Sequence, residues 1–123
     1  MMRIKKARQI LKSLADDTRL RIINLLGKQE LNVTELCEIV GVNQSNLSKH
    51  LARLRLTGVV TDRREGLNVY YHLRKPENRA HKELVNAITI GLSELEVFKK
   101  DLEKLNKSKK GKGIVKTVEV RNE

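Results

Sequence analysis

Two short amphipathic segments joined by a glycine constrain this chain more than any other feature; they span residues 32–54. Asn32 is a good helix N-cap residue, and Glu35 follows three positions later, as in a capping box. Gly41 suits the left-handed conformation that ends many helices, and Asn43 is placed to cap a second helix. The pattern therefore predicts two helices joined by a tight turn.

The second of these helices has two different faces. Leu47, Leu51 and Leu54 recur at helical spacing and form an apolar stripe that should point inward. Amide, hydroxyl and cationic side chains occupy the other face and the first turns, namely Gln44, Ser45, Asn46, Ser48, Lys49 and Arg53. Such groups suit base-pair edges and phosphates, so the stretch is typical of a helix-turn-helix whose second helix reads DNA. On spacing alone, a plain helical hairpin is the alternative.

A predicted β-hairpin follows the motif directly. Residues 59–61 and 69–73 have strand character, and Gly66 supplies the bend between them. Arg63 and Arg64 lie near the tip, from which they can reach the DNA backbone or the minor groove. A hairpin in this place is the wing of a winged helix; the alternative is an ordinary exposed hairpin whose arginines favour solubility.

Helical patterns flank this central part on both sides. The first helix, residues 3–15, has an apolar seam formed by Ile4, Ala7, Leu11 and Leu14. A second helix, capped by Asp16 and ended by Gly27, should be central in the core. From Pro76 to about Leu105 apolar residues recur every three or four positions, which predicts one long helix with a heptad seam.

These elements predict a mainly α fold with a small β-hairpin, a winged helix-turn-helix. The seams on the first and last helices match, so they predict a homodimer held by these two helices. The alternative is that the long helix folds back on its own domain. We expect one domain over residues 1–105, followed by a flexible basic tail over residues 106–123.

The charge balance favours a polyanionic partner. The chain of 123 residues has 26 lysines and arginines against 15 acids, a formal net charge of +11. Residues 1–15 carry five cations and no acid, while residues 41–75 and 104–123 each carry seven cations and two acids. Double-stranded DNA or an anionic membrane surface fits such a distribution, and the predicted motif favours DNA.

Other function classes find little support in the sequence. No apolar run approaches the roughly 18 residues of a membrane helix, and the basic N-terminus lacks the apolar core of a signal peptide. The single cysteine, Cys37, allows no intramolecular disulfide and fits a reducing compartment. No nucleophile motif, glycine-rich phosphate loop or pairing of histidine with an acid marks an enzyme or a cofactor site. We therefore expect a cytoplasmic protein with no membrane segment.

The sequence resembles the ArsR/SmtB family of bacterial and archaeal transcriptional repressors. The resemblance covers about residues 8–74 and rests on LADDTRLRIINLL, TELCEIVGVNQSNLSKHLARLRLTGVV and RREGLNVYYHL. It implies a dimeric winged helix-turn-helix repressor that leaves DNA when a metal ion or another inducer binds. By similarity, bases and phosphates would be contacted by Gln44, Ser45, Ser48 and Lys49, with His50 and Arg53 nearby and Arg63 and Arg64 in the wing.

The sensing sites are where this sequence departs from that family's pattern. The arsenic-type site has three clustered cysteines, and here those positions hold Asn32, Thr34 and Cys37. A lone thiolate is a poor soft-metal site, because affinity comes from converging ligands. The zinc-type site on the last helix retains His81, but Arg79 stands in place of its aspartate. We therefore predict no metal site and leave the inducer open.

Three residues admit more than one interpretation. Cys37 lies on an apolar face, which favours a buried core thiol over a redox or electrophile sensor, since a sensor needs a lowered pKa. His81 is expected at the surface, and His72 is expected to point outward on the wing. Overall, the sequence predicts a sequence-specific repressor that binds a near-palindromic operator as a homodimer. The alternatives are non-specific architectural DNA binding and a winged helix used for protein contact.

Overall fold

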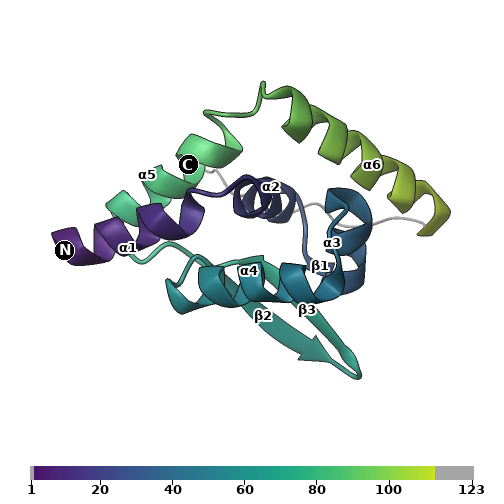
Figure 1. Ribbon diagram of the computed structural model, residues 1–123, viewed down its shortest axis with the longest axis horizontal. Helices are drawn as coiled ribbons and strands as arrows, with labels where there is room; N and C mark the ends of the chain where they lie inside the picture. Colours follow the sequence, from purple (N-terminus) through teal and green to yellow (C-terminus); the bar gives the residue numbers. More distant parts are fainter. Residues whose placement is uncertain (1, 113–123) are drawn as a thin grey trace.

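Six helices and a three-stranded antiparallel sheet form the part of the chain that the computed structural model describes, residues 2–112. Their bounds in chain order are α1 Ile4–Leu14, α2 Asp17–Leu26, β1 Leu31–Asn32, α3 Val33–Val40, α4 Gln44–Leu56, β2 Val60–Glu65, β3 Asn68–Leu73, α5 Arg79–Thr89 and α6 Glu96–Lys112. Figure 1 shows α2 in the middle, α4 and the hairpin along the lower edge, α1 and α5 at the left, and α6 at the upper right. The predicted fold class is confirmed.

The centre of the core is α2. The side chains of Ile22, Ile23, Leu25 and Leu26 are each at most 1% exposed. This helix packs against α4, α5 and α6. Burial of one such side chain stabilises a fold by about 1.5–3 kcal/mol. An almost wholly aliphatic core of this kind therefore holds the surrounding helices in place.

The helix-turn-helix forms as its capping residues predict. The Asn32 side chain accepts a hydrogen bond from the Glu35 N–H at 2.8 Å, and the Glu35 carboxylate accepts one from the Asn32 N–H at 2.9 Å. Gly41 ends α3 with a φ of 82°, a conformation that only glycine adopts without strain. Asn43 then caps α4 by accepting a bond from the Asn46 N–H at 2.8 Å. These local contacts set the turn that orients α4.

The hairpin is also confirmed, and a third strand supports it. β2 and β3 pair in antiparallel register around a turn at Gly66, and β3 also pairs with β1 through Leu31 and Tyr71. Tyr71 and Leu73 pack against the core. Because an isolated hairpin is marginally stable, the third strand and these core contacts are what hold it beside α4.

The single long helix predicted from Pro76 to about Leu105 is wrong. The structure divides the stretch into α5 and α6, separated by a turn over residues 90–95. The Gly91 N–H donates to a carbonyl five residues back, on Asn86, so the helix widens and ends there. A Cβ on Gly91 would lie 2.4 Å from a carbonyl oxygen of α5, which leaves no room for another residue at this ending.

After the turn, α6 folds back across α2 and α3. Its apolar residues Phe98 and Leu105 are buried, and Asp101 forms a salt bridge with Arg21 of α2. The second half of the predicted seam is therefore buried within one chain, which was the alternative considered for this stretch. The helix also continues to Lys112, beyond its predicted end. The rest of the predicted tail, residues 113–123, lies outside the described residues.

The apolar seam predicted on α1 is divided between core and surface. Leu14 of the predicted seam is buried against the core. Ile10, which the predicted seam did not include, is buried there as well. Ile4 and Leu11 are 81% and 51% exposed. One face of α1 thus presents large apolar side chains to the outside of a single chain.

Candidate nucleic-acid interface

The predicted recognition helix presents its polar residues together. Three leucines on the inner face, Leu47, Leu51 and Leu54, are fully buried, which fixes the rotation of α4 about its own axis. As a result, six of the predicted contact residues are exposed on this helix: Gln44, Ser45, Asn46, Ser48, Lys49 and Arg53. The N-terminal turn is the part of a recognition helix that reaches base edges. Here that turn carries only amide and hydroxyl side chains.

His50 is the exception among the predicted residues of α4. Its side chain is half-buried on the edge of the helix that faces α2. Arg19 of α2 donates a hydrogen bond to His50 Nδ1 at 3.0 Å, and the Asp16 carboxylate lies 3.7 Å from the same nitrogen. These contacts suit a residue that positions α4 against α2 better than one that reaches for a base.

A groove separates α4 from the hairpin. It has a volume of about 430 Å³ and is lined by Ser48, Leu51, Ala52, Arg55, Leu56 and Tyr71. Arg55 forms a salt bridge with Asp62 of β2 at 3.0 Å, so it ties the end of α4 to the hairpin. The sequence interpretation missed Arg55. The spacing of Arg55 could have placed it there, because it follows Ser48 by seven residues. That distance is about two helical turns, so both side chains lie on the same side of α4.

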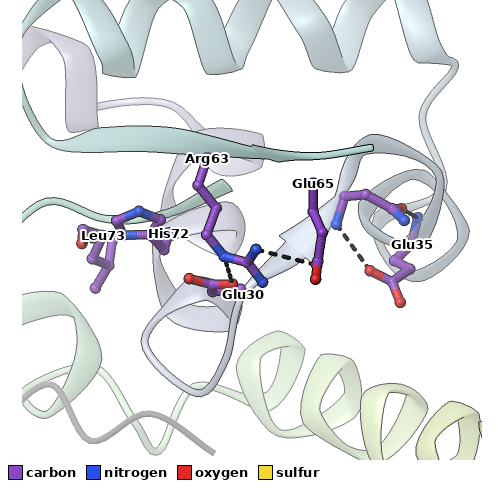
Figure 2. Close-up of polar contacts among 7 residues, drawn as sticks. Glu30, Glu35, Arg63, Glu65, His72 and Leu73 are labelled. Carbon is purple, nitrogen blue, oxygen red and sulfur yellow. Dashed lines mark hydrogen bonds and ion pairs between the residues drawn. The ribbon is translucent and has the colours of Figure 1, made fainter. Parts of the chain in front are cut away.

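The two hairpin arginines differ in their surroundings. Arg63 forms salt bridges with Glu30 at 2.7 Å and with Glu65 at 3.2 Å, as Figure 2 shows. Its guanidinium also lies over the ring of Tyr70, 5.0 Å from the centroid. The hydrogen bonds to Glu30 and Glu65 raise the pKa of Arg63, so its charge is permanent but already compensated. The paired charge leaves Arg63 less available for a phosphate.

Arg64 lies on the opposite face of the same strand. Successive side chains of a strand alternate between faces, so Arg64 shares its face with Asp62, which pairs with Arg55 of α4. Arg64 is exposed and pairs with no carboxylate among the described residues. The structure thus points one hairpin arginine toward the side of α4 and holds the other on the far side.

His72 and Cys37 do not extend this surface. His72 is half-buried on β3, with Nδ1 3.1 Å from the Leu73 carbonyl oxygen, rather than fully exposed (Figure 2). Cys37 is half-buried and packs against the core. Burial raises the pKa of its thiol, and the neighbouring Glu38 raises it further. Since a sensor cysteine requires a lowered pKa, these surroundings favour a packing role for Cys37.

His81 is buried, so the expectation that it lies at the surface is wrong. It is 4% exposed on the inner face of α5, together with Val85 and Ile88. The spacing of these three residues is helical and could have placed His81 in the core. Burial lowers the pKa of its imidazole; Glu77 acts in the opposite direction, and Arg74 and Lys6 lower the pKa further.

We expect the stability of the protein to fall on acidification because of His81. Folding lowers its pKa below the ordinary value of 6.5, so below that pH the unfolded chain takes up a proton that the folded chain resists. The free energy of unfolding should drop by up to about 1.4 kcal/mol per pH unit in this window. Urea titrations at about pH 7.5, 6.5 and 5.5 measure this slope.

His81→Gln should reduce that slope, while His72→Gln is the matched control and should preserve it. An unchanged slope in the His81→Gln protein would assign the acid sensitivity to other groups.

The described residues contain no cluster of side chains of the types that usually bind a metal ion. Within residues 2–112, no three histidine, cysteine, aspartate or glutamate side chains come together. Searching the same residues for a helix long and apolar enough to cross a membrane finds none.

Comparisons with known proteins agree on one class. Residues 16–62 match the model of a family described as "bacterial regulatory protein, arsR family". The transcriptional activator HlyU of Vibrio cholerae is 41% identical over 68% of this chain and 77% of its own length. Its solved structure has a TM-score of 0.59, covering 67% of this chain and 89% of that chain at 41% identity. The transcriptional repressor PagR of Bacillus anthracis is 37% identical over 71% of this chain and 88% of its own.

A further solved structure is that of a homodimeric winged helix-turn-helix DNA-binding domain, Mb0332 from Mycobacterium bovis. It is 27% identical to this chain, with a TM-score of 0.62, over 74% of this chain and 82% of that one.

Proposed function

Since this chain belongs to the ArsR family of DNA-binding transcriptional regulators, we propose that it binds a near-palindromic operator as a homodimer and represses the adjacent genes. The observation that carries the proposal is the exposed amide and hydroxyl first turn of α4, on a helix whose rotation is fixed by buried leucines. The family is one of transcription regulators, not of enzymes. A regulator of this kind would act in the cytoplasm, where the DNA is.

The structure supports different roles for different residues of the interface. Gln44 and Ser45 would contact base edges, because they lie in the first turn of α4. Ser48, Lys49 and Arg53 would contact phosphates and neighbouring bases farther along the helix. Asn46 is exposed in the same turn, so its side chain would contact the DNA beside them, while its backbone N–H donates to Asn43. His50 and Arg63 would position α4 and the hairpin, and Arg64 would reach the backbone or the minor groove.

We expect Arg64→Ala to weaken binding to all DNA sequences and to flatten the salt dependence. Each phosphate contact contributes about 0.9 to the slope of log K against log salt concentration. The slope should fall by about 0.9 for each protomer whose Arg64 contacts a phosphate. Fluorescence anisotropy at several salt concentrations measures it.

Arg63→Ala is the matched control for that experiment. Its side chain is already paired with Glu30 and Glu65 on the other face of the strand, so its loss should change the slope less. A larger change with Arg63→Ala than with Arg64→Ala would reverse the proposed roles of the two arginines.

A homodimer would cover the exposed apolar face of α1. Ile4 and Leu11 project from this helix, which lies beside α5 in Figure 1. Further exposed apolar side chains follow α5, at Ile90 and Leu92. A two-fold dimer through α1 and α5 would place two copies of α4 about 34 Å apart, one turn of DNA. The homodimeric relative supports the formation of a dimer.

Leu11→Glu should convert the dimer to a monomer. The substitution places a charge in the proposed interface, where an unpaired charge is strongly unfavourable, while the residue contributes little to the core of one chain. Analytical ultracentrifugation measures the mass, and we expect the operator affinity to fall with it. Lys12→Glu, next to it on the exposed surface of α1, is the charge control. A Leu11→Glu protein that stays dimeric would place the interface elsewhere.

The experiment that tests the proposed function compares the affinity for selected operator DNA with that for random DNA at one salt concentration. Specific regulators typically bind their sites about 10³–10⁷ times more tightly than random DNA. A ratio near one would instead support architectural DNA binding. Repression is tested separately, with a reporter gene placed behind the selected operator; increased expression would make the protein an activator.

A further inference from the structure

A second cavity adjoins the groove beside the hairpin, with which it shares Arg55 and Leu56. It has a volume of about 330 Å³ and is bordered by α1, the end of α4 and the start of α5. Four of its lining side chains are cationic and one is a carboxylate: Arg3, Lys6, Arg55 and Arg74 against Glu77. The volume falls at the lower end of the range for small-molecule sites, about 300–1,000 Å³. The cavity therefore has the size for a small molecule and the charge for an anion.

Half of this positive charge is not compensated by a carboxylate. Arg74 pairs with Glu77 at 3.2 Å, and Arg55 pairs with Asp62 at 3.0 Å. Arg3 and Lys6 have no carboxylate partner among the described residues. The Lys6 ammonium donates one hydrogen bond, to the Thr57 carbonyl oxygen at 3.2 Å, and has two more protons to donate.

A buried histidine also borders the cavity. His81 lines the cavity, is 4% exposed, and its Nε2 has no hydrogen-bond partner among the described residues. A buried polar atom without a partner is unfavourable. An imidazole N–H can donate to an oxyanion, as lysine and arginine do. A bound oxyanion would neutralise Lys6 and Arg3 together, next to the imidazole of His81.

We propose that this cavity binds a small molecule carrying a phosphate or carboxylate group, held by Arg3 and Lys6 beside the imidazole of His81. Two elements distant in sequence, α1 and α5, supply these groups, so the site exists only in the folded chain. A phosphate of the DNA backbone has the same chemistry as a phosphate ester, and the experiment below separates these two sources.

Occupancy of the cavity would act on the end of the recognition helix. Thr57 is the C-cap of α4, and Lys6 holds its carbonyl oxygen from α1. A ligand that draws Lys6 into the cavity would release this contact between α1 and α4. This regulatory consequence rests on the proposed function, whereas binding of the anion does not.

The binding test is an NMR titration of the full-length protein with inorganic phosphate, and separately with acetate, at constant ionic strength. The chain has three histidines, His50, His72 and His81. We expect the imidazole signals of His81 to shift and saturate with at least one of the two anions, while those of His50 and His72 stay in place. Equal shifts of all three, or no saturation with either anion, would overturn the proposal.

Lys6→Gln should weaken anion binding about tenfold, the effect of losing one charge-assisted hydrogen bond. Lys5→Gln is the matched control, because Lys5 is exposed on the same helix and does not line the cavity. Equal weakening by both variants would show that anion binding depends only on the net charge of the protein, and it would refute the site. Since Lys6 is exposed, its replacement should leave the fold intact.

DNA titrations distinguish the two sources of phosphate. Without added anion, Lys6→Gln should keep the salt slope of DNA binding; a slope lowered by about 0.9 for each protomer would show that Lys6 contacts a DNA phosphate and would overturn the small-molecule proposal. The anion that saturates His81 should change the DNA affinity of the unaltered protein and not that of Lys6→Gln. Absence of that change would refute the regulatory consequence alone, because the NMR measurement involves no DNA.

Discussion

Replacing Gln44 and Ser45 together with alanine should remove a large part of the preference for the operator over random DNA. Both side chains are exposed in the first turn of α4, which reaches base edges in a helix-turn-helix. A good base contact discriminates against the wrong base by about 1–3 kcal/mol, and a dimer loses it in both half-sites. We therefore expect specificity to fall by roughly 2–6 kcal/mol, measured as the ratio of the two dissociation constants at one salt concentration.

The affinity of this double variant for random DNA should remain nearly unchanged, because non-specific binding depends on phosphate contacts. Gln9→Ala is the matched control: Gln9 is exposed on α1, outside the candidate interface. If the double variant retained the full ratio of the unaltered protein, α4 would not be the element that reads bases.

The elements of the winged helix that could be predicted from the sequence are those determined by contacts between near neighbours. Asn32 and Glu35 complete their capping box across three residues, and Gly41 takes the left-handed conformation that ends α3. The stripe of Leu47 and its neighbours fixes the inner face of α4 by helical periodicity alone. The exposed face of the recognition helix could be predicted for the same reason, because it is the face opposite the buried leucines.

The division between α5 and α6 could not be predicted in the same way. The apolar spacing continues in phase from Ile88 to Phe98, so a heptad pattern fits two short helices as well as one long helix. Gly91 lies within this spacing, but a single glycine lowers helix stability by only about 1 kcal/mol and does not by itself predict a break. The decision between a straight helix and a turn depends on the burial of Phe98 and the salt bridge of Asp101, which are tertiary contacts.

Partners distant in sequence likewise decide the roles of the charged residues in the candidate site. Strand alternation places Arg63 on the same face as Glu65, but its contact with Glu30, 33 residues away, could not be predicted from the local sequence. His81 differs in this respect: its helical spacing with Val85 and Ile88 could have placed it in the core, but the cations that act on it, Arg74 and Lys6, come from outside α5. The sequence therefore indicates which side chains the candidate site contains, but it does not show which of them are free to contact a ligand.

Asp101→Asn should destabilise the protein by about 3 kcal/mol, because it removes one charge from an ion pair that joins α6 to α2. Arg21 donates two hydrogen bonds to the Asp101 carboxylate, both at 2.8 Å, and Asp101 is 1% exposed. The hydrogen bond to Asp101 is the largest cause of the raised pKa of Arg21. Arg21 is 21% exposed, so water reaches its guanidinium and keeps the effect at the lower end of the usual 3–5 kcal/mol for breaking a buried pair. Urea unfolding measures the loss.

Two further variants separate the loss of this ion pair from a general effect of charge on α6. Glu103→Gln removes a carboxylate from the exposed side of the same helix and should change the free energy of unfolding by less than about 0.5 kcal/mol. Arg21→Met combined with Asp101→Leu removes both charges, leaves no unpaired ion in the core, and should be more stable than Asp101→Asn alone. If Asp101→Asn and Glu103→Gln had equal effects, the fold-back of α6 would depend on Phe98 and Leu105 rather than on the ion pair.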